Sequence, residues 1–307
     1  MKKISLIIFV ILLFCVIVSS FILYKSRVYR SWSVVKQTAQ SLSQKSPPPI
    51  NHIVIITMEN KSYDDIVGNA NVPYINSLIH RFGFADNYFA VTHPSLPNYL
   101  ALIGGSTFGV RSDCIDCFIN SPNLIDQLEK AHKTWKAYME SMPSSCFIGN
   151  SGDYAQKHDP FIYFDDIRNN QKRCSNIVPY SEIATDLKAT KTTPDFMWIS
   201  PNLCNDMHNC STQVGDTWLS TQIPKILTSP AFTKQQSLLV ITWDEGENLS
   251  TNQVPAIFVG NTVKSGFTSH TLYSHYSMLH TIEAIWNLPF LNTNVSQSNS
   301  ITDIFNK

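Results

Sequence analysis

Apolar residues fall into short continuous runs and longer helical patterns that alternate from residue 50 to residue 307. The continuous runs, rich in Val and Ile, are typical of strands buried on both faces of a sheet, and the spaced patterns are typical of amphipathic helices. Strands that alternate with helices predict an α/β three-layer sandwich with a largely parallel central sheet. In chain order, the predicted elements are the strand HIVIITMEN (52–60), the helices PYINSLIHRFG (73–83) and LPNYLALIGG (96–105), the helix and strand of PNLIDQLEKAHKTWKAYME (122–140), the strands DFMWIS (195–200), SLLVITWDEGE (237–247) and VPAIFVG (254–260), and the helix YSHYSMLHTIEAIWNLP (273–289).

The N-terminus has a different pattern. The 21 residues from Ile4 to Tyr24 carry no charge, Gly or Pro and follow two lysines. This length can cross a bilayer as a helix, whereas the apolar part of a cleaved signal peptide is normally about 7–15 residues and closes on small residues. We therefore expect residues 1–30 to form an uncleaved membrane anchor, with a cleaved signal peptide as the alternative. Residues 31–49 are polar and end in three prolines, which predicts a semi-rigid spacer before a single domain at residues 50–307.

Composition limits the classes of binding partner and the cellular compartment that we expect. The 23 Lys and Arg residues balance the 23 Asp and Glu residues, so no overall field draws the chain to nucleic acid. Six of the seven cysteines follow the apolar N-terminal segment, and an even number beyond an export signal predicts disulfides in an oxidising compartment. We predict one pair, Cys204 with Cys210; Cys114, Cys117, Cys146 and Cys174 leave three pairings open. The domain is therefore expected in the cell envelope or secreted, and as a monomer.

Two of the predicted strands end in polar clusters. Glu59 and Asn60 follow the first strand, and Asp244 and Glu245 follow the strand that starts at residue 237. The carboxyl ends of parallel strands meet at one edge of a sheet, so these side chains should converge. Three converging carboxylates repel one another unless a cation neutralises them, and oxygen ligands suit a hard divalent ion. The alternative is that both clusters are ordinary solvated strand ends.

The stretch THPSLPNYLALIGG (92–105) carries two hydroxyl groups before a predicted helix. Pro97 suits the first helical turn, and Ser95 stands where an N-cap residue would. A helix N-terminus also offers free N–H groups and a positive dipole end, which together bind phosphate. Ser95 could thus be a cap or a nucleophile, and the local pattern alone favours the cap.

Two histidines lie in polar loops. His158 belongs to KHDPF (157–161), and His208 lies with Asp206 in CNDMHNC (204–210). Histidines in loops are more often solvated than catalytic. This loop, held by two cysteines, nevertheless carries more polar groups than a turn requires.

Six motifs in order between residues 53 and 289 resemble one family, the bacterial phosphoesterases that include acid phosphatases and phosphatidylcholine-type phospholipases C, within the alkaline phosphatase superfamily. They are MEN (58–60), THPSLPNYLAL (92–102), KHDPF (157–161), PNLCNDMHNC (201–210) with GDTWL (215–219), ITWDEGE (241–247) and SHYSMLHTIEAIWNLP (274–289). HPSLPNYLAL, NDMH and ITWDE are most similar to the secreted acid phosphatase branch, which implies phosphoinositides among the candidate substrates.

The resemblance implies roles for particular residues. SLPNY is similar to the Thr-x-Pro-Asn-His nucleophile motif of related nucleotide pyrophosphatases, which selects Ser95 as the nucleophile and leaves Thr92 as the alternative. The family's histidines that contact the phosphoryl group match His158 and His208. The metal ligands implied are Glu59, Asn60, Asp244, Glu245 and the Ser95 oxygen, and further candidates for substrate binding are Asn98, Asp206 and His275. His275 stands at a predicted helix start, which favours a cap or a supporting group over direct contact with substrate.

These matches predict a metal-dependent phosphomonoesterase with a phosphoserine intermediate and an acidic pH optimum. One divalent ion is expected, since a second would need histidine ligands that the sequence does not place. After WDEGE the chain reads NLSTNQVP, whereas the phospholipase branch has a Gly-rich, His-containing continuation, which favours monoesters over diesters. The alternatives are a phospholipase C and, from another class, a catalytically inactive envelope binding protein.

Overall fold

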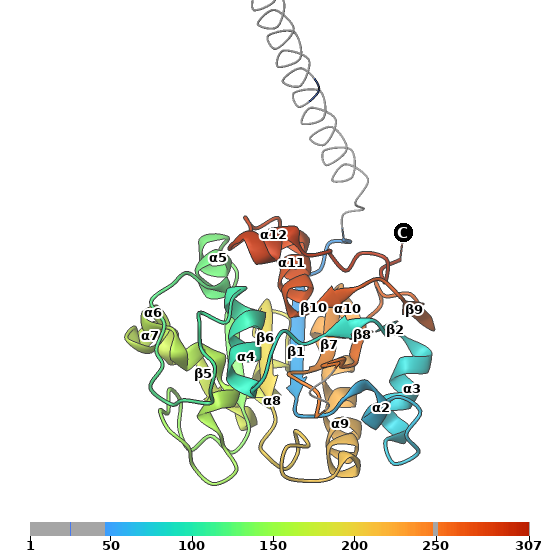
Figure 1. Ribbon diagram of the computed structural model, residues 1–307, viewed down its shortest axis with the longest axis horizontal. Helices are drawn as coiled ribbons and strands as arrows, with labels where there is room; N and C mark the ends of the chain where they lie inside the picture. Colours follow the sequence, from blue (N-terminus) through green and yellow to red (C-terminus); the bar gives the residue numbers. More distant parts are fainter. Residues whose placement is uncertain (1–24, 26–46, 248–250, 307) are drawn as a thin grey trace, which may run out of the picture. The chain divides into compact units, whose positions relative to one another are not determined.

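A central sheet organises the computed structural model, which describes Lys25 and residues 47–247 and 251–306 (Figure 1). Within these residues the sheet order is β5 (Ile177–Pro179), β4 (Trp135–Met139), β6 (Phe196–Ser200), β1 (His52–Met58), β7 (Ser237–Trp243), β8 (Ala256–Val259), β2 (Gly83–Ala85) and β9 (Phe267–Ser269). Neighbouring strands run parallel, except that β8 is antiparallel to both β7 and β2. Two short strands, β3 (Tyr88–Phe89) and β10 (Tyr273–Ser274), pair separately. The predicted α/β fold with a largely parallel sheet is confirmed.

Crossover helices cover both faces of this sheet. The connections from β1 to β2, from β5 to β6 and from β6 to β7 step across it in one direction and carry α3 (Pro73–Arg81), α8 (Ile183–Asp186) and α9 (Thr212–Leu227). The connection from β2 to β4 steps in the opposite direction and carries α4 (Ser95–Gly104). Since such crossovers are right-handed, α4 lies on the face opposite to the other three, and α11 (His275–Ile285) packs against it.

The remaining helices are short. They are α2 (Tyr63–Ile66), α5 (Leu124–Lys130), α6 (Asp165–Arg168), α7 (Gln171–Cys174), α10 (Pro230–Lys234) and α12 (Thr293–Gln297), with the 3-10 turns η1 (Gln156–His158), η2 (Pro160–Tyr163) and η3 (Tyr180–Glu182). Helix α11 ends at Ile285, earlier than the predicted stop at Pro289.

Strands β1 and β7 form the centre of the sheet, and every residue of both is buried. They pair in parallel from His52 opposite Ser237 to Met58 opposite Trp243. The next backbone N–H, that of Asp244, donates to the Met58 carbonyl at 2.9 Å. The register therefore brings the residues that follow the two strands side by side at one edge of the sheet.

Three disulfides fix the loops at and near this edge. The structure pairs Cys204 with Cys210, the pair selected from the sequence, and resolves the open alternatives as Cys114 with Cys117 and Cys146 with Cys174. The described residues from 47 onward belong to one compact unit. Within the described part of the chain, no helix has the length and apolar character needed to span a bilayer. The anchor expected at residues 1–30 and most of the spacer lie outside the described residues.

Candidate active site

Three carboxylates meet at the carboxyl ends of β1 and β7. Glu59 and Asp244 are fully buried, and Glu245 is 6% exposed. Asn60 has a positive φ of 52°, and its N–H donates to Asp244 Oδ1 at 3.1 Å. The convergence expected from the two strand ends is thus present, and these groups lie in the interior rather than as solvated strand ends.

Ser95 lies against this cluster. It is the first residue of α4, and Pro94 takes the N-cap position, so the preference for Ser95 as a helix cap is wrong. The Ser95 hydroxyl lies 3.1 Å from Glu59 Oε2 and 3.2 Å from Glu245 Oε1. Its single proton can be donated to one of these carboxylates at a time.

The second hydroxyl of the motif has another use. Thr92 Oγ1 donates to the carbonyl of His93 at 3.2 Å and has no hydrogen bond to the carboxylates. Asn98, expected to bind substrate, instead holds this loop. Its Oδ1 accepts from the backbone N–H groups of Val91 and Thr92, and its Nδ2 donates to the carbonyls of Thr92 and Pro94. Its amide therefore has no donor or acceptor left for a ligand, because all are used within the loop.

His158 lies between two acids. Its Nε2 is 3.1 Å from Glu59 Oε1, its Nδ1 is 3.1 Å from Asp206 Oδ2, and its ring stacks on Tyr99 with centroids 5.3 Å apart. Burial opposes the charged ring, but the charge of Glu59 and the bonds to both acids raise the pKa of His158 to about 9. Both ring nitrogens of His158 thus face carboxylates of the chain, and the expected contact with a phosphoryl group stays a prediction.

Glu59 is the counterpart of His158. Burial alone would raise the pKa of Glu59, but the charge of His158, with help from Lys157 and a 2.5 Å hydrogen bond from Tyr99, lowers it to about 2. The lowered pKa favours the ionised form of Glu59 beside Ser95.

Lys157 is a site residue that the sequence analysis missed. Its Nζ lies 2.9 Å from Asp113 Oδ2, 3.1 Å from His208 Nε2 and 3.5 Å from Ser95 Oγ. Burial lowers the pKa of Lys157, yet the charges of Glu59 and Asp113 outweigh it and keep the side chain cationic. The one available signal was its place beside His158 in KHDPF.

Asp113 also changes what the end of α4 can bind. Its Oδ1 accepts the backbone N–H of Leu96 at 3.0 Å, and Pro97 has no N–H to offer. The backbone N–H groups at the start of α4, which we expected to bind phosphate, are therefore partly used, because Asp113 accepts one of them. Lys157, rather than the helix end alone, supplies positive charge next to Ser95.

Asp206 and His275, two of the candidates for substrate binding, both contact groups of the protein itself. Asp206 is buried, bonds His158, and accepts the backbone N–H of His208 at 2.7 Å. His275 lies 3.0 Å from the Tyr88 hydroxyl through Nδ1 and 2.6 Å from the Asp244 carbonyl through Nε2. Burial lowers the pKa of His275 to about 4, so it stays neutral and supports the Asp244 segment.

The acids fit a divalent cation. Asp244 Oδ2 is buried and has no hydrogen-bond partner among the described residues. Burial and the charges of Glu59 and Glu245 raise the pKa of Asp244 well above its ordinary value, and burial with Glu59 raises that of Glu245 to about 8. A divalent ion would remove this repulsion. Of the predicted ligands, Glu59, Ser95, Asp244 and Glu245 have side-chain oxygens in this cluster, and Asn60 contacts it through its backbone N–H.

The described residues hold a second candidate ligand group that the sequence did not reveal. Ligand atoms of Glu59, His158 and His208 all lie within 4.8 Å of one another. Here, however, His158 is engaged by two carboxylates and His208 Nε2 by the Lys157 ammonium. A cation at this position would compete with the Lys157 ammonium for His208 Nε2. His93, whose Nδ1 is 2.5 Å from Glu245 Oε2, is a further neighbour of the carboxylate cluster.

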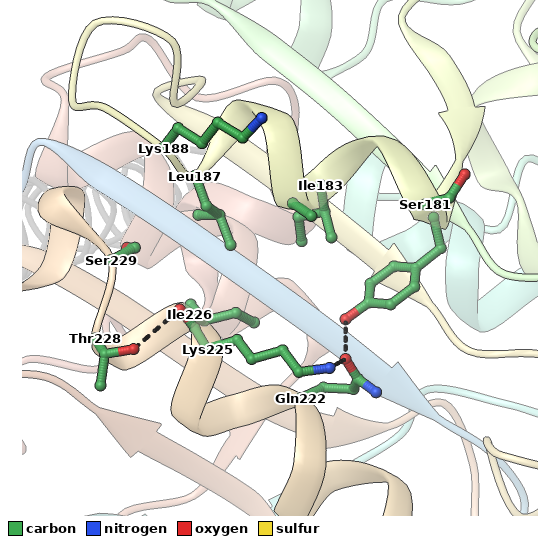
Figure 2. A pocket seen from close by; sticks show the side chains of 11 residues that line it. Ser181, Ile183, Leu187, Lys188, Gln222, Lys225, Ile226, Thr228 and Ser229 are labelled. Carbon is green, nitrogen blue, oxygen red and sulfur yellow. Dashed lines mark hydrogen bonds between the residues drawn. The ribbon is translucent and has the colours of Figure 1, made fainter.

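A separate cavity of about 450 Å³ lies between α8 and α9 (Figure 2). Its lining is largely apolar, with Leu187 and Ile226 facing each other, and Lys225 Nζ donates to Gln222 Oε1 at 3.0 Å. None of its lining residues belongs to the carboxylate cluster. Ser95 and the buried acids thus lie outside this cavity.

Solved structures with the same fold place the chain in a class. They include a protein of the alkaline phosphatase superfamily from Vibrio parahaemolyticus (TM-score 0.56, 12% identity, 82% of this chain and 71% of that chain). Another is the lipoteichoic acid synthase LtaP from Listeria monocytogenes (TM-score 0.57, 10% identity, 81% and 76%). At these identities the likeness shows the fold alone, which is that of an alkaline phosphatase-like α/β sandwich.

Sequence relatives define the family. The chain is 35% identical over 281 residues to the phosphatidylinositol-3-phosphatase of Mycobacterium tuberculosis, covering 86% of this chain and 90% of that protein. It is 31% identical to a probable acid phosphatase of Kluyveromyces lactis, covering 88% of this chain and 66% of that longer protein. The profile of the phosphoesterase family matches residues 69–289. The chain belongs to the phosphoesterase family.

Proposed function

We propose that this chain hydrolyses phosphomonoesters with Ser95 as the nucleophile. The observation that carries the proposal is the environment of the Ser95 hydroxyl. Glu59 and Glu245 provide carboxylate acceptors for its proton, and the Lys157 ammonium lies next to its oxygen. A serine becomes nucleophilic when a neighbouring group takes its proton and a nearby positive charge stabilises the alkoxide. The Thr92 hydroxyl has neither.

The side chains divide the work of phosphoryl transfer. Ser95 Oγ attacks phosphorus and passes its proton to a carboxylate oxygen that it already contacts. Lys157 stabilises negative charge on the equatorial oxygens, and the Lys157–His208 pair, in contact through Nζ and Nε2, gives a proton to the leaving alcohol. Water then hydrolyses the phosphoserine and regenerates Ser95.

A divalent ion held by Glu59, Asn60, Asp244, Glu245 and the Ser95 oxygen would supply charge neutralisation at the reacting oxygens. His158 has a supporting task in this scheme, because it fixes Glu59 and cancels part of the charge of the acid cluster. We propose one such ion, on the oxygen-rich group.

We propose phosphoinositides among the substrates. Support comes from the relative named a phosphatidylinositol-3-phosphatase, which this chain covers over 90% of its length. We also propose extracytoplasmic action of a monomeric domain at residues 50–307, with an anchor at residues 1–30 that keeps it at a membrane. Three disulfides in the described residues support an oxidising compartment.

A matched pair of variants tests the nucleophile. We expect Ser95→Ala to lower turnover of p-nitrophenyl phosphate by about 10³-fold or more, since the covalent route is lost, and Thr92→Ala to lower it less than about tenfold. Near-wild-type turnover by Ser95→Ala together with loss in Thr92→Ala would reverse the assignment. Parallel assays with bis-p-nitrophenyl phosphate and phosphatidylcholine test the diesterase alternative, which predicts faster release from these diesters than from the monoester.

A further inference from the structure

Three large apolar side chains are exposed on two loops that disulfides hold. Ile115 is 51% exposed and Phe118 40% exposed, and both belong to the Cys114–Cys117 loop region. Ile148, 51% exposed, follows Cys146, which is bonded to Cys174. We call Ile115, Phe118 and Ile148 the apolar rim.

The two loops of the rim are joined to each other by one buried side chain. Gln156 Nε2 donates to the Ile115 carbonyl at 2.9 Å, and Gln156 Oε1 accepts the N–H of Gly149 at 2.7 Å. Gln156 is fully buried and directly precedes Lys157. The rim is thus attached to the residue that contacts Ser95.

The first loop also contacts the site directly. Asp113, which precedes the Cys114–Cys117 disulfide, bonds both Lys157 and the first turn of α4. The side chains of Asp113 and Lys157 are 29% and 18% exposed, whereas Ser95 is 1% exposed. Two of the groups beside Ser95 that reach solvent are thus the groups to which the rim is tied.

Contacts of the Cys114–Cys117 loop with neighbouring side chains favour the exposed position of the rim. The Cys114 carbonyl accepts the hydroxyl of Tyr163 at 2.9 Å, so the loop cannot fold its apolar tip inward without losing that bond. The Arg168 guanidinium lies 3.5 Å from the centroid of the Phe118 ring. An aromatic ring with a guanidinium against it suits the boundary between lipid headgroups and acyl chains.

We propose that the apolar rim inserts into a phospholipid surface and presents the phosphate of a lipid monoester to Ser95. This inference rests on the proposed phosphomonoesterase function. The charges near the rim favour insertion over electrostatic attraction, because the exposed Arg111 is offset by Asp116 and because Arg168 is paired with Asp165. Binding should therefore occur on zwitterionic as well as anionic lipid and depend little on salt.

Hydrolysis by the full chain tests the rim with two substrates. The double variant Ile115→Ser/Ile148→Ser should lose about tenfold in kcat/KM for a long-chain phosphatidylinositol 3-phosphate in phosphatidylcholine vesicles and keep its rate on p-nitrophenyl phosphate. Phe290→Ser is the matched control. Phe290 is 47% exposed and lies after the last residue of α11, whereas the first residue of that helix, His275, contacts the Asp244 carbonyl. Equal losses on both substrates, or none on either, would overturn the proposal.

A second readout does not require catalysis. With vesicles of brominated phosphatidylcholine, the fluorescence of Ile115→Trp should be quenched more than that of Phe290→Trp, which carries the same number of tryptophans. Equal quenching contradicts the rim even if phosphate is released normally. Selective quenching without hydrolysis of any monoester would keep the rim and refute the proposed function.

Discussion

The strand ends and the loops of this protein contribute opposite charges to one site. The ends of β1 and β7 supply the buried acids Glu59, Asp244 and Glu245, whose places follow from the register of two fully buried strands. The loops supply Lys157 and His208, which are partly exposed and held by ion pairs and a disulfide. Rigid strands can hold charges that repel one another, and the loops bring the groups that neutralise them.

The strand ends and the loops also have different tasks. Acids fixed on a sheet give a constant geometry for a cation, whereas cations and histidines on loops can adjust to a substrate. Changes at the strand ends should therefore abolish catalysis, and changes in the loops should reduce it in steps.

The largest expected effect comes from a strand end. Asp244→Asn should lower turnover of p-nitrophenyl phosphate by about 10³-fold, because it removes a charged ligand for the divalent ion. The same change removes buried repulsion, so the thermal midpoint in EDTA should be equal to or higher than that of the unsubstituted chain. Added divalent metal should raise the midpoint of the unsubstituted chain and not of the variant. A strong fall of the midpoint in EDTA would instead mean that Asp244 stabilises the fold.

The second-largest effect on catalysis is expected from the positive charge of Lys157. Lys157→Met should reduce kcat by about 10²-fold, since one cation next to the transferred group is lost. Lys157→Arg should recover part of the rate. Asp113→Asn, which keeps Lys157 and weakens only its orientation, should cost less than Lys157→Met. If Lys157→Met has a normal rate and Asp113→Asn does not, the charge at Ser95 is not what matters.

The loop disulfide should have a smaller effect. Replacing Cys204 and Cys210 together by Ser should cost about 2 kcal/mol of stability, because a short closed loop is released in the unfolded chain. It should also lower kcat about tenfold by freeing His208. Chemical denaturation and steady-state rates measure both. The pair Cys146→Ser/Cys174→Ser, outside the catalytic loop, should affect stability with little effect on kcat.

The smallest effect is a pH dependence of stability without metal. The pKa of Glu245 is raised to about 8 and that of His158 to about 9 in the folded chain, so each stabilises the fold below its unfolded pKa. This stabilisation is lost as the pH rises through the pKa values that Glu245 and His158 have in the folded chain. The thermal midpoint in EDTA should therefore fall between about pH 5 and pH 9. Divalent metal should flatten the curve, and a rising midpoint over this range would contradict the assigned charges.

Much of the sheet could be predicted from the sequence because β1 and β7 are long, continuous apolar runs. Their parallel pairing was enough to expect Glu59 and Asp244 side by side. Helix α9 was not predicted, since its sequence is rich in Thr, Ser and Gln and contains Pro224. The three-residue strands β2 and β9 have no pattern of their own and depend on their neighbours.

The site was predictable where it depends on strand ends and less so where it depends on loops. Lys157 and Asp113 are 44 positions apart, and no local pattern links them. Motif matches made Asn98 a candidate for substrate binding and left His275 between a supporting and a binding role, but they could not show which protein groups each side chain contacts. Only the folded contacts distinguish a positioning residue from a ligand-binding one.

The most direct measurement is to trap the covalent intermediate. The enzyme, turning over p-nitrophenyl phosphate at mildly acidic pH with divalent metal, is quenched with acid and digested, and its peptides are analysed by mass spectrometry. We expect one added phosphate on the peptide that contains THPSLPNYLAL, located at Ser95 and absent from Ser95→Ala. Phosphate on Thr92, or rapid turnover with no phosphorylated peptide, would contradict Ser95 as the nucleophile.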